Sequence, residues 1–130
     1  MENKNTKVLI VDDDDFLINM YSLKFKNEGF EVVNSKSGRD AVDKLKTGLK
    51  PDIILLDLIM PDIDGFGVLD SIKKDDLLGD GTVIIMLTNQ GSSDDIEKAK
   101  ELGVDGYIVK ATSIPSEVVK KVLEIFNNKK

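Results

Sequence analysis

The sequence contains no cysteine, no histidine and no tryptophan. The absence of cysteine excludes disulfides, thiol nucleophiles and cysteine-ligated metals. The absence of histidine excludes the Ser-His and Cys-His nucleophile pairs, histidine general bases and nearly all zinc sites. Any chemistry in this chain therefore has to use carboxylates, hydroxyls, lysine and, if a metal takes part, a hard cation.

Long apolar runs and an excess of basic residues are also lacking. No apolar run approaches the ~20 residues that a membrane-spanning helix needs, and residues 1–7 lead into no apolar segment of the signal-peptide kind. We therefore expect a cytoplasmic protein without a membrane partner. The net charge is −6. Nucleic-acid binding calls for a basic face, so we expect no nucleic-acid partner.

Two kinds of apolar segment alternate along the 130 residues. Short β-branched runs, typical of strands buried in a parallel sheet, lie at residues 8–11, 30–33, 53–56, 83–87 and 107–109. Longer segments have helical spacing, as in the stripes Phe16, Met20, Leu23 and Val119, Val122, Leu123, Phe126. The alternation predicts a single α/β domain, a doubly wound five-stranded parallel sheet with five helices and right-handed crossovers.

Capping residues agree with this division. Gly29 and Gly103 follow helical segments, where a left-handed residue often ends a helix. Residues 92–94, Ser-Ser-Asp, are suited to the start of the fourth helix, and Ser113 or Pro115 to the start of the fifth.

Polar side chains follow four of the predicted strands directly. Asp12 and Asp13 follow the first strand, Asp57 the third, Thr88 the fourth and Lys110 the fifth. Ligand sites of open α/β sheets lie beyond the carboxyl ends of the strands. We therefore expect three carboxylates, a hydroxyl and an ammonium at one edge of the sheet.

Three converging carboxylates repel one another unless a cation neutralises them. An all-oxygen set points to Mg²⁺, which is bound by few carboxylates and keeps several waters. A carboxylate can also act as a nucleophile toward phosphorus. Phosphoryl transfer needs mainly positioning and charge neutralisation, which Mg²⁺, Lys110 and Thr88 can supply.

Four stretches carry a family resemblance: Val-Leu-Ile-Val-Asp-Asp-Asp (8–14), Ile-Ile-Leu-Leu-Asp-Leu-Ile-Met-Pro-Asp-Ile-Asp-Gly (53–65), Met-Leu-Thr (86–88) and Gly-Tyr-Ile-Val-Lys (106–110). Together they resemble the receiver domain of bacterial two-component response regulators, from about Lys7 to Phe126. The resemblance implies the flavodoxin-like strand order 2-1-3-4-5.

The resemblance also implies a role for each site residue. Asp57 matches the phosphoacceptor. Asp13 matches the direct Mg²⁺ ligand, Asp12 a ligand that acts largely through water, and the backbone carbonyl of Ile59 a third protein ligand. Lys110 matches the residue that pairs with the phosphoryl group. Thr88 matches the hydroxyl that moves toward that group, and Tyr107 matches the aromatic residue coupled to the movement.

The implied function is phosphorelay signalling by a single-domain regulator of the chemotaxis type. Residues 1–130 would form one receiver domain without an output domain, acting as a switch and not as an enzyme. A histidine kinase or phosphotransfer protein would supply the phosphoryl group. A separate effector would then read the face formed by the fourth helix, fifth strand and fifth helix. The protein would be a monomer or a phosphorylation-dependent dimer.

Other classes fit the residues less well. A haloacid-dehalogenase-type phosphatase requires a second Asp two residues after the nucleophile, where this chain has Ile59. A nucleotide-binding loop would meet repulsion from Asp12 and Asp13, and an EF-hand would need a ligand at Met60. A pseudo-receiver that is never phosphorylated remains an alternative. Asp14 and Asp15 are interpreted as helix-capping residues.

Two positions depart from the family pattern. The residue after Lys110 is Ala111 where the family usually has proline, so we expect a trans peptide bond there. Asn89, after Thr88, is bulkier than the usual small residue and would narrow access to the phosphoryl group. Ile59 and Gln90 occupy positions that resemble those tuning the phosphoryl lifetime.

Overall fold

The computed structural model describes residues 6–79, 81–89, 92–110 and 113–129. In these residues, strands and helices alternate: β1 (Lys7–Val11), α1 (Asp15–Asn27), β2 (Glu31–Ser35), α2 (Gly38–Lys46), β3 (Ile53–Asp57), α3 (Gly65–Lys74), β4 (Val83–Thr88), α4 (Ser93–Glu101), β5 (Gly106–Val109) and α5 (Pro115–Lys129). The strands pair in parallel in the order β2-β1-β3-β4-β5. The predicted fold class and strand order are confirmed.

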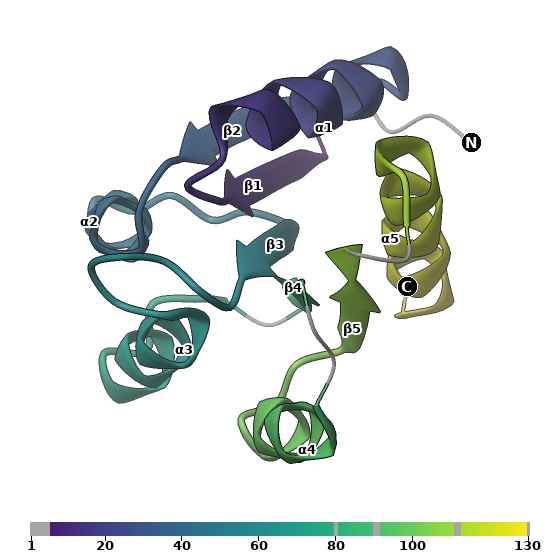
Figure 1. Cartoon of the computed structure of the whole chain (residues 1–130). Helices are drawn as coiled ribbons and strands as arrows, with labels where there is room; N and C mark the ends of the chain where they lie inside the picture. Colours follow the sequence, from purple (N-terminus) through teal and green to yellow (C-terminus); the bar gives the residue numbers. More distant parts are fainter. Residues whose placement is uncertain (1–5, 80, 90–91, 111–112, 130) are drawn as a thin grey trace.

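The helices form one layer on each face of the sheet. Figure 1 shows α1 and α5 on one face and α2, α3 and α4 on the other. Successive strand residues point to opposite faces, so the strands of the centre contribute to two separate cores. One core contains Val8, Ile10, Ile53 and Leu55 with α1 and α5; the other contains Leu9, Val11, Ile54 and Leu56 with α2, α3 and α4. Burial on both faces explains the continuous apolar runs.

The first helix is confirmed, but the apolar stripe that predicted it is not its buried face. Phe16 is 68% exposed and Leu23 is 57% exposed. The buried face of α1 instead consists of Ile18, Tyr21, Ser22 and Phe25. Two of these carry hydroxyl groups, and the Ser22 hydroxyl donates a hydrogen bond to Asn34 Oδ1 at 3.0 Å. A buried polar side chain with an internal partner therefore occupies a position that composition assigns to the surface.

Several predicted helix ends are confirmed. Gly29 and Gly103 have φ angles of 91° and 88°, the left-handed conformation that glycine adopts without strain. Ser92 caps α4 and accepts a hydrogen bond from Asp95 N at 3.1 Å, and α5 begins at Pro115. Asp14 caps α1 by accepting a hydrogen bond from Leu17 N at 3.1 Å, as interpreted for the acidic run.

Helix α4 is the least embedded of the helices described above. Within residues 93–101, Ala99 is the one buried residue, and the Lys98 ammonium lies 4.5 Å from the centre of the Phe66 ring of α3. A hollow of about 170 Å³ lies between α4 and β5, lined by Ile96, Lys100, Val104 and Tyr107 among others. Helix α4 is therefore joined to the rest of the domain through few apolar contacts.

Gly65, the first residue of α3, lies against the end of β3. A Cβ atom at this position would be 2.7 Å from the Asp57 carbonyl oxygen and 3.0 Å from Leu58 Cα. Both neighbours are backbone atoms, which cannot move aside as a side chain can. The chain therefore needs glycine here so that α3 can begin directly beneath the site edge.

We expect the substitution Gly65→Ala to lower the free energy of unfolding by roughly 2 kcal/mol, because the added methyl group forces backbone shifts. Gly79→Ala is the matched control, since a Cβ there meets no described atom within 4 Å, and its effect should stay within about 0.5 kcal/mol. Urea unfolding followed by circular dichroism measures both. Equal stability of the two variants would contradict the close approach.

None of the helices in the described residues is both long enough and apolar enough to cross a membrane.

Candidate functional site

The register of the sheet brings the predicted site residues to one edge. Asp57 is the last residue of β3 and pairs with Leu87 of β4, and Thr88 follows directly and pairs with Val109 of β5. Lys110 is the next residue along the chain. Because the strands are parallel, their carboxyl ends lie side by side, and residues that are far apart in sequence become neighbours.

Asp12 follows β1 and is 1% exposed. Its backbone N–H donates to the Ser35 carbonyl at 3.1 Å, which continues the β1–β2 ladder by one residue. Its Oδ1 accepts a hydrogen bond from Asp14 N at 3.0 Å, so the side chain shapes the turn that leads into α1. Oδ2 lies 2.7 Å from Lys110 Nζ.

Lys110 bridges two of the carboxylates. Its ammonium lies 2.7 Å from Asp12 Oδ2 and 3.4 Å from Asp57 Oδ2, and its side chain is only 9% exposed. Burial of a charged group is costly unless a partner compensates it. One ammonium between two buried carboxylates leaves the site with an excess of negative charge.

That excess appears in the protonation of Asp57. The pKa of Asp57 is raised to about 7, first by burial and then by the Asp12 carboxylate, while the Lys110 ammonium acts in the opposite direction. Without a further cation, a large fraction of Asp57 is therefore protonated at neutral pH. A protonated carboxyl group is a poor nucleophile, so a cation at this position would also activate Asp57.

The carboxylates fit a divalent cation. Among the described residues, Asp12, Asp13 and Asp57 form a group whose oxygen atoms all lie within 4.8 Å of one another. Asp13 is exposed while the other two are buried, so the group opens to solvent on one side. The buried Asp12 Oδ2 accepts no hydrogen bond from the described residues and has only the charge contact with Lys110. An all-oxygen group of this kind suits a hard cation that keeps several waters.

Thr88 follows Leu87, the β4 residue that pairs with Asp57, and Tyr107 lies on β5 opposite Met86. Thr88 is 1% exposed, and its side chain is hydrogen-bonded to the Tyr107 phenol. Burial raises the pKa of Tyr107, the negative charge of Asp95 at the start of α4 adds to this, and the hydrogen bond with Thr88 opposes it. Through this hydrogen bond, Thr88 connects the site edge of the sheet to Tyr107 of β5, which lines the hollow between α4 and β5.

Tyr21 is a neighbour of the site that the sequence interpretation missed. It is 2% exposed, and burial, followed by the charges of Asp12, Asp57 and Asp14, raises its pKa. The spacing of Ile18, Tyr21 and Phe25 contains the signal, because these positions are i, i+3 and i+7 on a helix. This face was not identified because the stripe that includes Phe16 and Leu23 is more apolar.

The β3–α3 loop completes the edge. Ile59 lies in this loop, and its side chain is 68% exposed. Asp62, also in the loop, accepts hydrogen bonds from the backbone N–H groups of Gly38 and Arg39 at 3.2 and 2.8 Å. Burial acts to raise the pKa of Asp62. The hydrogen bonds from the backbone N–H groups of Arg39, Ile63 and Gly38 outweigh this effect and hold the pKa of Asp62 below its usual range. The sequence interpretation assigned this segment no such contact.

Asn89, Gln90 and Ala111 were named as departures from the family pattern or as tuning positions. Asn89 follows Thr88 and is exposed. Gln90 and Ala111 lie outside the described residues, so the peptide bond after Lys110 remains a prediction.

Comparison with known proteins defines the class. Residues 8–123 match the family described as the response regulator receiver domain. The chain is 37% identical over 124 residues to the response regulator protein VraR of Staphylococcus saprophyticus, covering 94% of this chain and 57% of that protein. It is 33% identical over 121 residues to the alkaline phosphatase synthesis transcriptional regulatory protein PhoP of Bacillus subtilis, covering 93% and 48%. The chain thus spans about half the length of these curated relatives.

Solved structures give the same class. The chemotaxis protein CheY4 of Vibrio cholerae is 29% identical with a TM-score of 0.81, and the match covers 92% of this chain and 98% of that one. A Francisella response regulator receiver domain is 27% identical with a TM-score of 0.81, over 97% and 100% of the two chains. The chain belongs to the receiver domain family of the response regulators, which act as switches in two-component signalling.

Proposed function

We propose that Asp57 accepts a phosphoryl group from the phosphohistidine of a histidine kinase or phosphotransfer protein. An Asp57 oxygen forms a bond to phosphorus while the phosphorus–nitrogen bond of the donor breaks, and that bonding pair remains on the imidazole. The product is an acyl phosphate on Asp57. The observation that supports this most is the placement of Asp57 beside the Lys110 ammonium that it shares with Asp12, with a pKa raised to about 7 that a bound cation would lower.

The proposed cation is Mg²⁺, held by Asp13 and Asp57 directly, by Asp12 largely through water and by the Ile59 carbonyl. When bound, it neutralises the carboxylates and the developing charge on the phosphoryl oxygens. Lys110 is already beside Asp57, at 3.4 Å, and contributes the second positive charge. Thr88 supplies a hydroxyl on the adjacent strand. Turnover beyond this is only slow self-catalysed loss of the phosphoryl group.

The proposed readout runs from Thr88 to α4. A phosphoryl group on Asp57 offers Thr88 a stronger acceptor than its present partner, Tyr107. Exchange of that hydrogen bond frees Tyr107 to move inward and reshapes the face of α4, β5 and α5. A phosphorylated and an unphosphorylated population then differ in the surface that an effector meets.

The wider setting is part of the same proposal. Residues 1–130 act as a single receiver domain in the cytoplasm, and a separate effector protein binds the switched face. The protein works as a monomer or as a dimer that forms on phosphorylation, without nucleic acid or membrane as partner.

The test uses a small phosphodonor. Incubation with Mg²⁺ and acetyl phosphate should add the mass of one phosphoryl group to the wild type, with acetate as the leaving group. Asp57→Ala should remain unlabelled. Chelation of Mg²⁺ should reduce the labelling rate by roughly 100-fold or more, the effect expected when a major electrostatic stabiliser is removed. Absence of labelling in the wild type, as for a pseudo-receiver, or equal labelling of Asp57→Ala would refute the proposal.

A further inference from the structure

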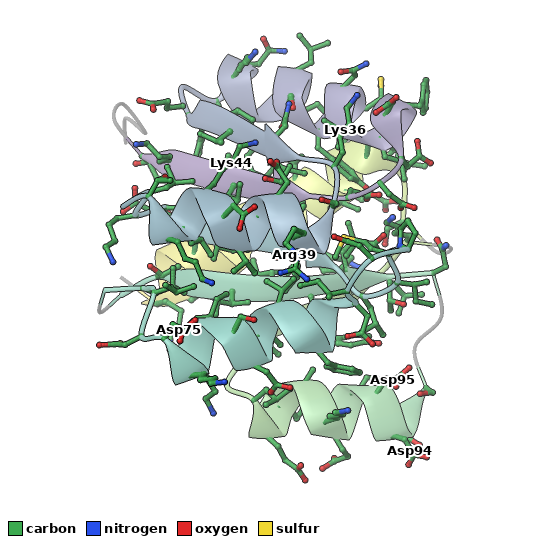
Figure 2. The ribbon with its side chains drawn as sticks, turned by 90° about the vertical axis from the view of Figure 1, so that its left-hand side faces the viewer. Lys36, Arg39, Lys44, Asp75, Asp94 and Asp95 are labelled. Carbon is green, nitrogen blue, oxygen red and sulfur yellow. The ribbon has the colours of Figure 1, made fainter. Side chains whose placement is uncertain are left out.

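Asp62 fastens the β3–α3 loop to a helix that is distant in sequence. Its Oδ1 lies 3.2 Å from Gly38 N and its Oδ2 lies 2.8 Å from Arg39 N. Both N–H groups belong to the first turn of α2, where backbone donors have no acceptor within the helix. One carboxylate therefore satisfies two such donors across 23 to 24 positions of sequence. Figure 2 shows Arg39 at the end of α2 nearest the site edge, on the side toward α3.

Packing around Gly38 holds the loop and the helix together at the same place. A Cβ atom at Gly38 would lie 2.5 Å from Ile63 Cγ1 and 2.9 Å from Val68 Cγ2. Ile63 follows Asp62 directly and packs against the core beneath α2 and α3. The loop consequently approaches α2 as closely as the absence of a side chain allows.

Other contacts hold the β3–α3 loop near its two ends, among them a hydrogen bond from Gly65 N to the Leu58 carbonyl at 2.7 Å. Leu58 N donates to the Leu87 carbonyl at 2.9 Å, and Met60 is 7% exposed. Asp64 caps α3 through Gly67 N at 2.8 Å. Ile59 lies between the first two anchors, and Asp62 is the polar anchor that follows them. The loop segment that contains Ile59 is thus held by the sheet at Leu58 and by α2 at Asp62.

We infer that Asp62 is a positioning residue that sets the affinity of the site for Mg²⁺. It acts through the loop and not by coordination, because its oxygens accept hydrogen bonds from α2 amides and it lies outside the group formed by Asp12, Asp13 and Asp57. This inference rests on the proposed function, in which the Ile59 carbonyl is a cation ligand. The coupling is reciprocal. If the contact of Asp62 with α2 stabilises the bound cation, the bound cation stabilises the first turn of α2 by the same free energy.

The experiment compares three variants by calorimetric titration with Mg²⁺. Asp62→Ala should weaken Mg²⁺ binding by about 10-fold, as for other residues that support a metal ligand from outside the coordination shell. Asp62→Asn removes the same charge but keeps an oxygen acceptor, and its loss should be no more than about 3-fold by the same scale. Asp52→Ala is the control. Asp52 Oδ2 accepts a hydrogen bond from Lys7 N at 2.8 Å, at the opposite edge of the sheet, and its removal should leave Mg²⁺ affinity unchanged.

Two further readouts separate positioning from general destabilisation. With acetyl phosphate, Asp62→Ala should need more Mg²⁺ for half-maximal labelling, while its rate at saturating Mg²⁺ should stay close to that of the wild type. Without Mg²⁺, hydrogen exchange of amides in residues 58–63 and at Gly38 and Arg39 should be faster in Asp62→Ala than in Asp52→Ala.

The outcomes are distinct. An unchanged affinity in Asp62→Ala, an equal loss in Asp52→Ala, or equal losses in Asp62→Ala and Asp62→Asn would overturn this inference alone, provided that the wild type binds Mg²⁺ and is labelled. A wild type that neither binds Mg²⁺ nor is labelled would overturn the proposed function and this inference together.

Discussion

Lys110→Met is expected to slow phosphoryl transfer to Asp57 by roughly 10²–10³-fold, the usual effect of removing one preorganised charge from a transfer site. The same change should tighten Mg²⁺ binding. The Lys110 ammonium lies 2.7 Å from Asp12 Oδ2 and 3.4 Å from Asp57 Oδ2, so its loss leaves both buried carboxylates without their counter-charge. A divalent cation then gains more from entering the site, although the reaction loses a stabilising group.

This prediction is specific because the same variant should be slower in phosphoryl transfer and yet bind Mg²⁺ more tightly. Labelling by acetyl phosphate at saturating Mg²⁺ measures the rate, and calorimetry measures the affinity. Lys36→Met is the matched control, because the Lys36–Asp15 ion pair at 2.9 Å has side chains that are 70% and 67% exposed, and such pairs contribute little. A Lys110→Met variant that bound Mg²⁺ more weakly than the wild type would contradict the charge balance described above.

Asp57→Asn is expected to stabilise the metal-free protein at pH 8 by about 2 kcal/mol, a value discounted for partial solvation from the ~1.4 kcal/mol that each pKa unit represents. The pKa of Asp57 is raised to about 7 in the folded protein, against about 3.9 in an unfolded chain. At pH values between these two pKa values, the folded state retains the Asp57 proton while the unfolded state has largely lost it. The wild type therefore loses stability as the pH rises from about 4 to about 7, and this loss is complete above pH 7.

Urea unfolding at pH 5 and pH 8 in the presence of a chelator measures this difference. The amide that Asp57→Asn introduces has no proton to lose in this range, so the gap between variant and wild type should widen with pH. Mg²⁺ at about 100 times its dissociation constant should restore about 2.7 kcal/mol to the wild type. Asp70→Asn, which removes an exposed carboxylate on α3, controls for net charge. A wild type that gained stability relative to Asp57→Asn between pH 5 and pH 8 would contradict the raised pKa.

The sheet could be predicted because its strands are buried on both faces. Continuous runs such as residues 53–56 leave no alternation to misinterpret, and the alternation of strands and helices limits the topology. The face of α1 could not be predicted in the same way. Its buried side includes Tyr21 and Ser22, whose hydroxyls find compensation inside the protein, while Phe16 is exposed. Hydrophobicity alone does not record such internal partners.

The site likewise contains residues whose meeting could be predicted and a contact that could not. Asp12, Asp57 and Lys110 could be predicted to meet because each ends or follows a strand, and parallel strands end at one edge. The contact of Asp62 with α2 could not, because it joins a loop to a helix whose proximity depends on how closely α2 and α3 pack. In the sequence, Asp62 is one acidic residue in a turn between Pro61 and Gly65, and its composition predicts nothing more than the turn.

The sparse attachment of α4 has a thermodynamic consequence. With Ala99 as the one buried residue of its range and a hollow beside Tyr107, α4 gives up little apolar burial when it shifts or frays. Its local opening therefore costs a small part of the global free energy of unfolding, whereas α3, with Phe66, Val68, Leu69 and Ile72 buried, opens only near the global limit. Even a single rearranged hydrogen bond near Thr88 is then large enough, at about 1 kcal/mol, to redistribute the conformers of α4 while the sheet stays unchanged.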